Sequence, residues 1–261
     1  MHDGYLFPLY IDQESVAIVA ENVIESNIHV REGNKEMIPI SDNYPVQRTP
    51  IVNWILIGTC VLVFLWQLSL PQEGFQASVI LFGLIPKALT DAPLGHPQLL
   101  IPPVLSLFTS MFLHGGFLHL LGNMLYLHVF GNNVEDSMGH GRFIVFYLLC
   151  GVAAALAQTF IAPDSTIPMV GASGAISGIL GAYLLLHPFA QIKLLVPYFI
   201  LFFVWVPAWL MLGLWFLFQL LQSAATPGDE GGIAFAAHAG GFMAGMLLLP
   251  VFKRSDVSLL R

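Results

Sequence analysis

The sequence predicts an all-α membrane protein built as a bundle of six transmembrane helices. Of its 261 residues, 56% are hydrophobic and only 10% are charged, and the mean hydropathy is +0.76. A water-soluble domain of this length does not normally have such a composition. The apolar residues also gather in stretches of roughly 20 residues, the length that crosses the hydrocarbon core of a bilayer as a helix.

The charged residues lie mainly outside these stretches. The net charge of −7 comes largely from the first 48 residues, which hold eight acidic side chains against Arg31, Lys35 and Arg48. An acidic chain is not expected to bind nucleic acid. The two cysteines, Cys60 and Cys150, lie inside apolar stretches, so we expect them to behave as small hydrophobic residues and not as a disulfide framework.

The chain divides into a polar segment, a membrane domain and a tail. Residues 1–48 lack the basic and apolar parts of a secretory signal peptide. We therefore expect a weakly structured cytosolic segment that is small or dispensable, and Met37 could be a second start. Residues 49–254 form the predicted membrane domain, and residues 255–261 form a short cytosolic tail.

The predicted spans follow from uncharged runs and from the residues that end them. Residues 51–70 carry no charge and would be about 30 Å long as a helix, which is one hydrocarbon thickness. Prolines and glycines interrupt residues 71–113, whose apolar piece 81–89 is expected to lie in the membrane interface. In chain order the six spans are 51–70, 115–134, 143–162, 171–187, 207–221 and 233–252.

The fifth span needs a further argument. Residues 194–221 form an apolar run of 28 residues, which is too long for one span and too short for two with a turn. Proline suits the first turn of a helix and breaks an interior one, so we begin the span at Pro207. The residues before Pro207, rich in Phe, Val and Ile, are then predicted to form a membrane-embedded connection.

The basic residues predict the orientation of the bundle. Six spans place both termini on one side of the membrane, and eight of the nine Lys and Arg residues fall on that side, with Lys87 alone on the other. Because cytosolic loops carry the excess of Lys and Arg, both termini are predicted to be cytosolic. We expect an integral membrane protein, with the inner membrane of a bacterium as its location.

Four polar side chains then fall at a similar depth below the outer boundary. Counted at 1.5 Å per residue, Ser173 lies roughly 9 Å deep, and His119, Asn123 and His238 lie roughly 6, 12 and 8 Å deep. Polar groups are costly in hydrocarbon unless they face one another or water, so the set is a candidate functional site. For any one of them, hydrogen bonding between helices is the structural alternative.

The residue types favour nucleophilic catalysis. A serine hydroxyl needs a base to take its proton, and His238 can be that base for Ser173. The second, fourth and sixth spans contain no Asp or Glu, so the sequence predicts a dyad without a third acidic member. The backbone N–H of Ser173, Asn123 and His119 are donors suited to an oxyanion. Metal binding is a competing use of the two histidines, but no carboxylate or thiolate accompanies them, so no metal or other cofactor is expected.

These residues resemble the rhomboid family of intramembrane serine proteases. The turn at residues 171–174 is similar to its GxSG motif, residues 238–245 to its HxxGxxxG motif and residues 119–123 to its HxxxN motif, and the resemblance covers residues 37–254. It implies a rhomboid-like six-helix bundle that cleaves single-pass membrane proteins within or next to their transmembrane segment, without a cofactor. It implies catalytic Ser173 and His238, an oxyanion site at His119 and Asn123, and supporting glycines at Gly171, Gly174, Gly241 and Gly245.

Two departures from the family pattern stand out. Many relatives have Trp-Arg before the second span, where this chain has Leu105 and Ser106, which puts the packing of that loop in question. Many also place an aromatic ring four residues after the nucleophile, against the catalytic histidine, where this chain has Ser177. That serine could hydrogen-bond His238 or simply pack, and we favour packing.

Two other classes of function fit parts of the sequence. A small transporter could use His119 and His238 as a proton relay, although no span holds an Asp or Glu and the two halves of the chain are not duplicated. A non-catalytic relative could bind membrane clients, but such proteins usually lack the serine or the histidine. The identity of a substrate does not follow from this sequence.

Overall fold

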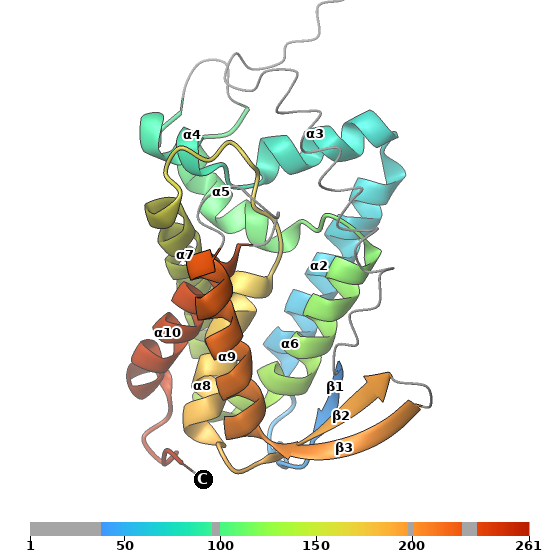
Figure 1. The fold of residues 1–261 in the computed structure, drawn as a ribbon, viewed down its shortest axis with the longest axis vertical. Coiled ribbons are helices and arrows are strands. Elements are labelled where there is room, and N and C mark those ends of the chain that lie inside the picture. The colour runs from blue at the N-terminus through green and yellow to red at the C-terminus, as the bar shows by residue number, and fades with distance from the viewer. Residues whose placement is uncertain (1–37, 96–99, 198–200, 226–233, 261) are drawn as a thin grey trace, which may run out of the picture.

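The computed structural model describes residues 38–95, 100–197, 201–225 and 234–260. This part of the chain is mostly helical, with a three-stranded sheet at one end of the bundle (Figure 1). Residues 1–37 of the predicted polar segment, including Met37, lie outside the described residues, as does Ile233, where the last span was predicted to begin.

Among the described helices, four are long and apolar enough to cross a membrane. They are α2 (Ile51–Ser69), α7 (His140–Ile161), α9 (Ala208–Ala225) and α10 (Phe235–Phe252). A fifth span results if the segment Pro103–Phe112 is joined to α6 (Phe117–Met138), to which it is bent by 81°. The apolar helix α8 (Ser173–Leu186) has 14 residues and is shorter than these. The described chain thus holds four or five candidate spans, and the count of six stays a prediction.

Each of the six predicted stretches coincides with a helix, but α6 runs further than predicted. Glu135 and Asp136 were taken to end the second span, whereas α6 continues to Met138. The reason is that the Glu135 carboxylate accepts the backbone N–H groups of Val52 and Asn53 at 3.0 and 2.7 Å. These are donors that the start of α2 leaves free, so the carboxylate is stabilised by a second helix.

Three short helices lie in the predicted interfacial region between the first two spans. They are α3 (Gln72–Phe82), α4 (Pro86–Asp91) and α5 (Pro103–Thr109), with a 3₁₀ turn at Ser110–Phe112. Between α3 and α4, the backbone of Leu84 exchanges two hydrogen bonds with Met169, at 2.9 and 2.7 Å. This pairing ties the region to the segment that leads into α8.

The connection before Pro207 contains two strands, which the prediction of an all-helical bundle did not include. The strands β2 (Gln191–Pro197) and β3 (Leu201–Pro207) form an antiparallel pair, and β1 (Ile38–Asp42) pairs with the other edge of β2. Residues 38–42, expected to be weakly structured, are therefore ordered as a strand. Valine and aromatic residues suit a half-buried strand as well as a membrane segment, which is why composition alone did not predict these strands.

The sheet has one buried face and one open face. Ile192 and Leu194 of β2 are fully buried against the helices. On the opposite face the Lys193 ammonium lies 4.6 Å from the ring centre of Phe203 and 5.8 Å from that of Trp205. This alternation follows from the twofold period of a strand, and the cation over aromatic rings is a favourable contact.

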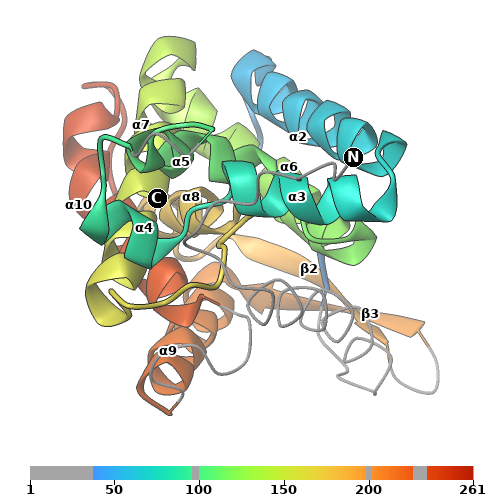
Figure 2. The same cartoon turned by 90° about the horizontal axis from the view of Figure 1, so that it is seen from above.

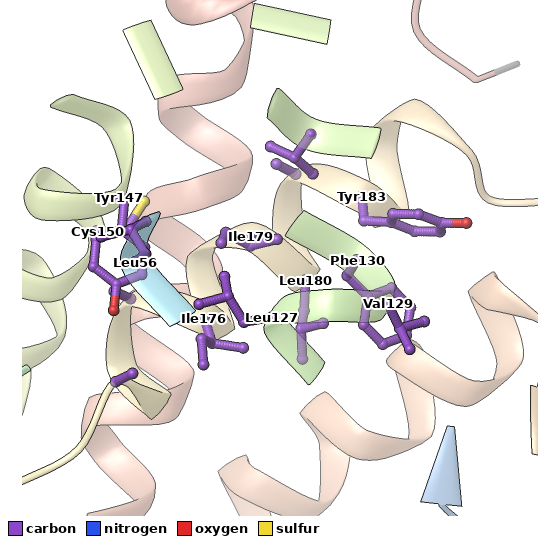
Figure 3. Close-up of a cluster of buried hydrophobic side chains, with 14 of the residues drawn as sticks. Leu56, Leu127, Val129, Phe130, Tyr147, Cys150, Ile176, Ile179, Leu180 and Tyr183 are labelled. Carbon is purple, nitrogen blue, oxygen red and sulfur yellow. The ribbon is translucent and has the colours of Figure 1, made fainter. Parts of the chain in front are cut away.

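The helix α8 lies at the centre of the buried core. Figure 3 shows Ile176, Ile179 and Leu180 of α8 between Tyr147 of α7 and Phe130 of α6. Seen from above, α8 is surrounded by other elements, whereas α9 lies at the edge of the bundle (Figure 2). The start of α8 is thus held in place by a helix with ten of its 14 residues buried.

Candidate active site

The turn before α8 is built around Gly171. This glycine has a φ of +120°, a conformation that side chains of other residues disfavour. A Cβ atom here would lie 2.7 Å from Nε2 of His119, so space also requires glycine. The Gly171 N–H donates to the Ser110 carbonyl at 2.9 Å. Ser173 is the first residue of α8, and its position is therefore held from outside the helix as well as from within.

The structure brings Ser173 and His238 together. Nε2 of His238, on α10, lies 2.8 Å from Oγ of Ser173. The two helices approach closely because glycines face each other: a methyl group at Gly241 would overlap the Gly174 carbonyl, and one at Gly245 would overlap the backbone of Gly178. Nε2 is thus at hydrogen-bond distance from the hydroxyl whose proton it would accept.

The other side of the His238 ring contacts α9. Its Nδ1 lies 2.9 Å from Oε1 of Gln219, a side chain that is only 5% exposed. The Trp215 ring lies beside the imidazole, with 6.0 Å between ring centres and an angle of 35° between the planes. The sequence argument missed both residues. Gln219 had a usable signal, since it is the only polar side chain in residues 207–221 and such residues in a span are rarely neutral in function.

His119 and Asn123 lie across the turn from His238. The position of a Cβ at Gly171 is 2.8 Å from Cε1 of His119 and 3.7 Å from Nδ2 of Asn123, so both side chains face this turn. Asn123 is buried, and its amide donates to the His119 carbonyl one helical turn earlier, at 2.9 Å. One N–H of that amide group is used in this bond, and the group carries a second.

Ser177 does not take the place of the aromatic ring found in many relatives. Its hydroxyl donates to the Ser173 carbonyl at 2.7 Å and not to His238, and the side chain is buried within α8. The expectation that it packs therefore agrees with the structure. The ring beside the histidine comes instead from Trp215, on a different helix.

The departure at Leu105 and Ser106 is accommodated within α5. Ser106 is buried, and its hydroxyl donates to the Pro103 carbonyl at 2.6 Å, inside the same short helix. Leu105 is 48% exposed and faces outward. Among the described residues, no three His, Cys, Asp or Glu side chains are close enough together to hold a metal ion.

Comparison with known proteins gives a consistent set of similarities. Residues 102–255 match the family described as the rhomboid domain. The chain is 34% identical over 200 residues to the mitochondrial rhomboid protein 1 of Saccharomyces cerevisiae, which covers 74% of this chain and 51% of that protein. It is 44% identical over 78 residues to the rhomboid protease GluP of Bacillus subtilis, covering 30% of this chain and 15% of that protein.

A further Bacillus subtilis protein, the putative rhomboid protease YdcA, is 37% identical over 78 residues, covering 30% of this chain and 39% of that protein. The match thus spans about half the length of the yeast relative and less of the two bacterial ones. Because mitochondrial and bacterial proteins are both among the relatives, the similarity does not single out a compartment.

Proposed function

Since this chain belongs to the rhomboid family, we propose that it is an intramembrane serine endopeptidase that cleaves single-pass membrane proteins within or next to their transmembrane segment. The observation that carries the proposal is the 2.8 Å distance between Oγ of Ser173 and Nε2 of His238. A client-binding protein without catalysis would have no need for this pairing of nucleophile and base, and a proton relay would have no need for the serine.

The chemistry follows from the pairing. His238 takes the hydroxyl proton as Ser173 Oγ attacks the carbonyl carbon of the scissile peptide bond. The tetrahedral oxyanion is stabilised by the backbone N–H of Ser173, the free N–H of the Asn123 amide and the His119 ring. The C–N bond then breaks, and His238 returns its proton to the leaving amine. A water molecule, deprotonated by His238, attacks the resulting ester, which releases the acid and restores the serine.

The position of Ser173 supports cleavage inside the membrane. With 14 residues, α8 is about 21 Å long, roughly 9 Å less than a hydrocarbon core. If α8 and the five longer segments make six spans with both termini in the cytosol, the shortfall lies on the outer side, at Ser173. The nucleophile would then lie below the membrane surface, at the floor of an opening that admits water.

Substrate entry is assigned to the side of the bundle formed by α9. A transmembrane substrate has to arrive from the lipid, and α9 has three buried residues among its 18. A helix with so few buried residues can be displaced more readily than α8 or α10.

Labelling with a serine-directed fluorophosphonate tests the proposal. The purified protein in detergent should be labelled and should cleave a single-pass membrane substrate, and Ser173→Ala should lose both activities while keeping its melting temperature. Ser177→Ala is the matched control, one turn further along α8, and should still be labelled. Labelling that persists in Ser173→Ala would move the nucleophile elsewhere, and a wild type without labelling or cleavage would overturn the proposal.

A further inference from the structure

The inner face of α9 places two side chains against His238. Its buried residues, Ala208, Leu212 and Gln219, together with the half-buried Trp215, are spaced by four, three and four positions and so share one face of the helix. The last two of these reach the imidazole, Trp215 beside its plane and Gln219 at its Nδ1 edge. Both nitrogens of His238 are therefore engaged, one by α8 and one by α9.

The Gln219 contact decides where the ring proton sits. An amide oxygen is only an acceptor, so the 2.9 Å contact requires a proton on Nδ1. A neutral imidazole with its proton on Nδ1 has its lone pair on Nε2, which is the atom that faces Ser173. The opposite tautomer would direct an N–H at the serine hydroxyl and could not accept its proton.

The surroundings make this contact hard to replace. Gln219 is 5% exposed, and the described part of α9 offers no second polar side chain between Pro207 and Leu221. If the amide oxygen is removed, the Nδ1–H loses its acceptor in a partly buried place, and the tautomer with the proton on Nε2 is no longer disfavoured.

We propose that Gln219 is a positioning residue for the reaction: its amide oxygen holds His238 in the orientation and tautomer that can accept the Ser173 proton, with the Trp215 ring fixing the plane of the imidazole. The inference rests on the proposed protease function and deepens it, because it makes the base depend on a helix outside the pair that carries serine and histidine. Displacement of α9 would then remove the support of the base.

Substitutions of Gln219 separate this role from simple packing. Gln219→Met keeps the length and volume of the side chain but has no acceptor, whereas Gln219→Glu keeps an acceptor. We expect Gln219→Met to lower kcat on a membrane substrate about tenfold or more, with KM changed less than twofold, because a lost hydrogen bond of this kind is worth roughly a factor of ten. The rate of fluorophosphonate labelling of Ser173 should fall in parallel, since labelling needs the activated serine but no substrate entry.

Two further variants complete the experiment. Gln219→Glu should recover most of the wild-type kcat and labelling rate. Gln222→Met, the same change one turn nearer the end of α9, should behave like the wild type. If Gln219→Met melts well below the wild type, Gln219→Asn replaces it, because its amide is one methylene too short to reach Nδ1, and the same losses are expected.

The outcomes distinguish this inference from the proposed function. A wild type that labels and cleaves, with Gln219→Met equal to it, overturns the role of Gln219 and leaves the protease intact. A Glu variant as slow as the Met variant also overturns it, because an acceptor would then be insufficient. A wild type that neither labels nor cleaves overturns the protease function itself.

Discussion

The helices α8 and α9 both reach the candidate site, but they are packed in opposite ways. Ten of the 14 residues of α8 are buried, compared with three of the 18 in α9. Figure 2 shows the same contrast, with α8 enclosed by its neighbours and α9 at the margin of the bundle. Ser173, the proposed nucleophile, comes from the enclosed helix, and Gln219, which faces the far edge of the His238 ring, comes from the marginal one.

This difference teaches how a site of the proposed kind could be buried and still admit a bulky substrate. Ser173 and His238, the proposed nucleophile and base, are carried by helices whose backbones approach closely at glycines, which keeps the distance between them constant. In the proposed function, a substrate helix entering from the lipid needs an element that can move, and α9 has the smallest share of buried residues among the four candidate spans of the described chain. Under the proposed function, the site would combine a fixed part, carried by α8 and α10, and a displaceable part, carried by α9.

The largest expected effect concerns the fixed part. Ser173→Ala, His238→Ala and the double variant should be about equally inactive, because the two residues are proposed to act as one unit. Asn123→Ala should keep slow turnover, lowered on the order of 10² to 10³, since an oxyanion donor contributes that much. Initial rates on one purified membrane substrate in detergent measure all four variants. A His238→Ala variant near the wild-type rate, beside an inactive Asn123→Ala, would show that base and oxyanion donor are wrongly assigned.

The second prediction sets a glycine of α8 against one of α9. A methyl group at Gly178 would overlap Cys150, and Gly178→Ala should destabilise the protein by about 3 kcal/mol. Gly213, in α9, has no described heavy atom within 4 Å of its added Cβ. Gly213→Ala should leave stability unchanged or raise it by about 0.5–1 kcal/mol, because alanine suits a helix interior better. Thermal unfolding in detergent compares the pair, and equal melting temperatures would contradict the contrast between the two helices.

The smallest effect is expected where β1 joins the bundle. The Asp42 carboxylate accepts hydrogen bonds from the Tyr183 hydroxyl and from the Asn133 amide, the latter at 2.7 Å. Asp42→Ala should destabilise this attachment by about 1–3 kcal/mol, because two donors lose their acceptor. Asp42→Asn keeps an acceptor and should cost less. Melting temperatures at pH 7 test the order, and an Ala variant as stable as the wild type would remove β1 from the folded core.

The same residue gives a pH dependence. Burial raises the pKa of Asp42 above its ordinary value of 3.8, and this outweighs the hydrogen bond from Tyr183, which lowers it. A raised pKa in the folded state means that the contribution of this carboxyl to stability is full below pH 3.8 and is lost as the pH rises through the folded pKa. The wild type should therefore lose stability relative to Asp42→Asn as the pH rises from about 4. Parallel curves for the two proteins would refute this shift.

The helices could be predicted from sequence because the membrane leaves few alternatives. An uncharged run of about 20 residues satisfies its backbone groups in hydrocarbon only as a helix, so the ends of α2, α7 and α10 lie within about three residues of the predicted ones. Glu135 was taken to end the second span, whereas α6 continues past it. Its carboxylate is bound by Val52 and Asn53, which lie more than 80 residues away in the chain, so the sequence did not show this stabilisation. The sheet was missed for the same reason, since β1 pairs with β2 across about 150 residues.

Within the site, local sequence motifs predicted that Ser173 and His238 lie close together. The contacts of α9 with His238 depend on which face of that helix turns inward, and the sequence did not show this. The glycines around both residues have a spacing that predicts close helix packing, and this spacing led to the pair. Gln219 and Trp215 face His238 only because α9 turns that side inward. A polar residue in an apolar run marks a position of interest, but its partner depends on tertiary structure.

The sheet at the end of the bundle holds the first turn of α9 in place. The first N–H groups of α9, from Ala208 and Trp209, donate to the carbonyls of Ala190 and Pro188 at 2.8 and 2.9 Å, and β3 leads directly into the helix. From Ala208 to Gln219 the helix rises about 17 Å. A tilt of roughly 10° about its first turn would therefore move Gln219 by about 3 Å. That displacement equals the whole length of its 2.9 Å contact with His238. A small tilt of α9 would thus separate Gln219 from His238 while leaving the first turn of the helix in place.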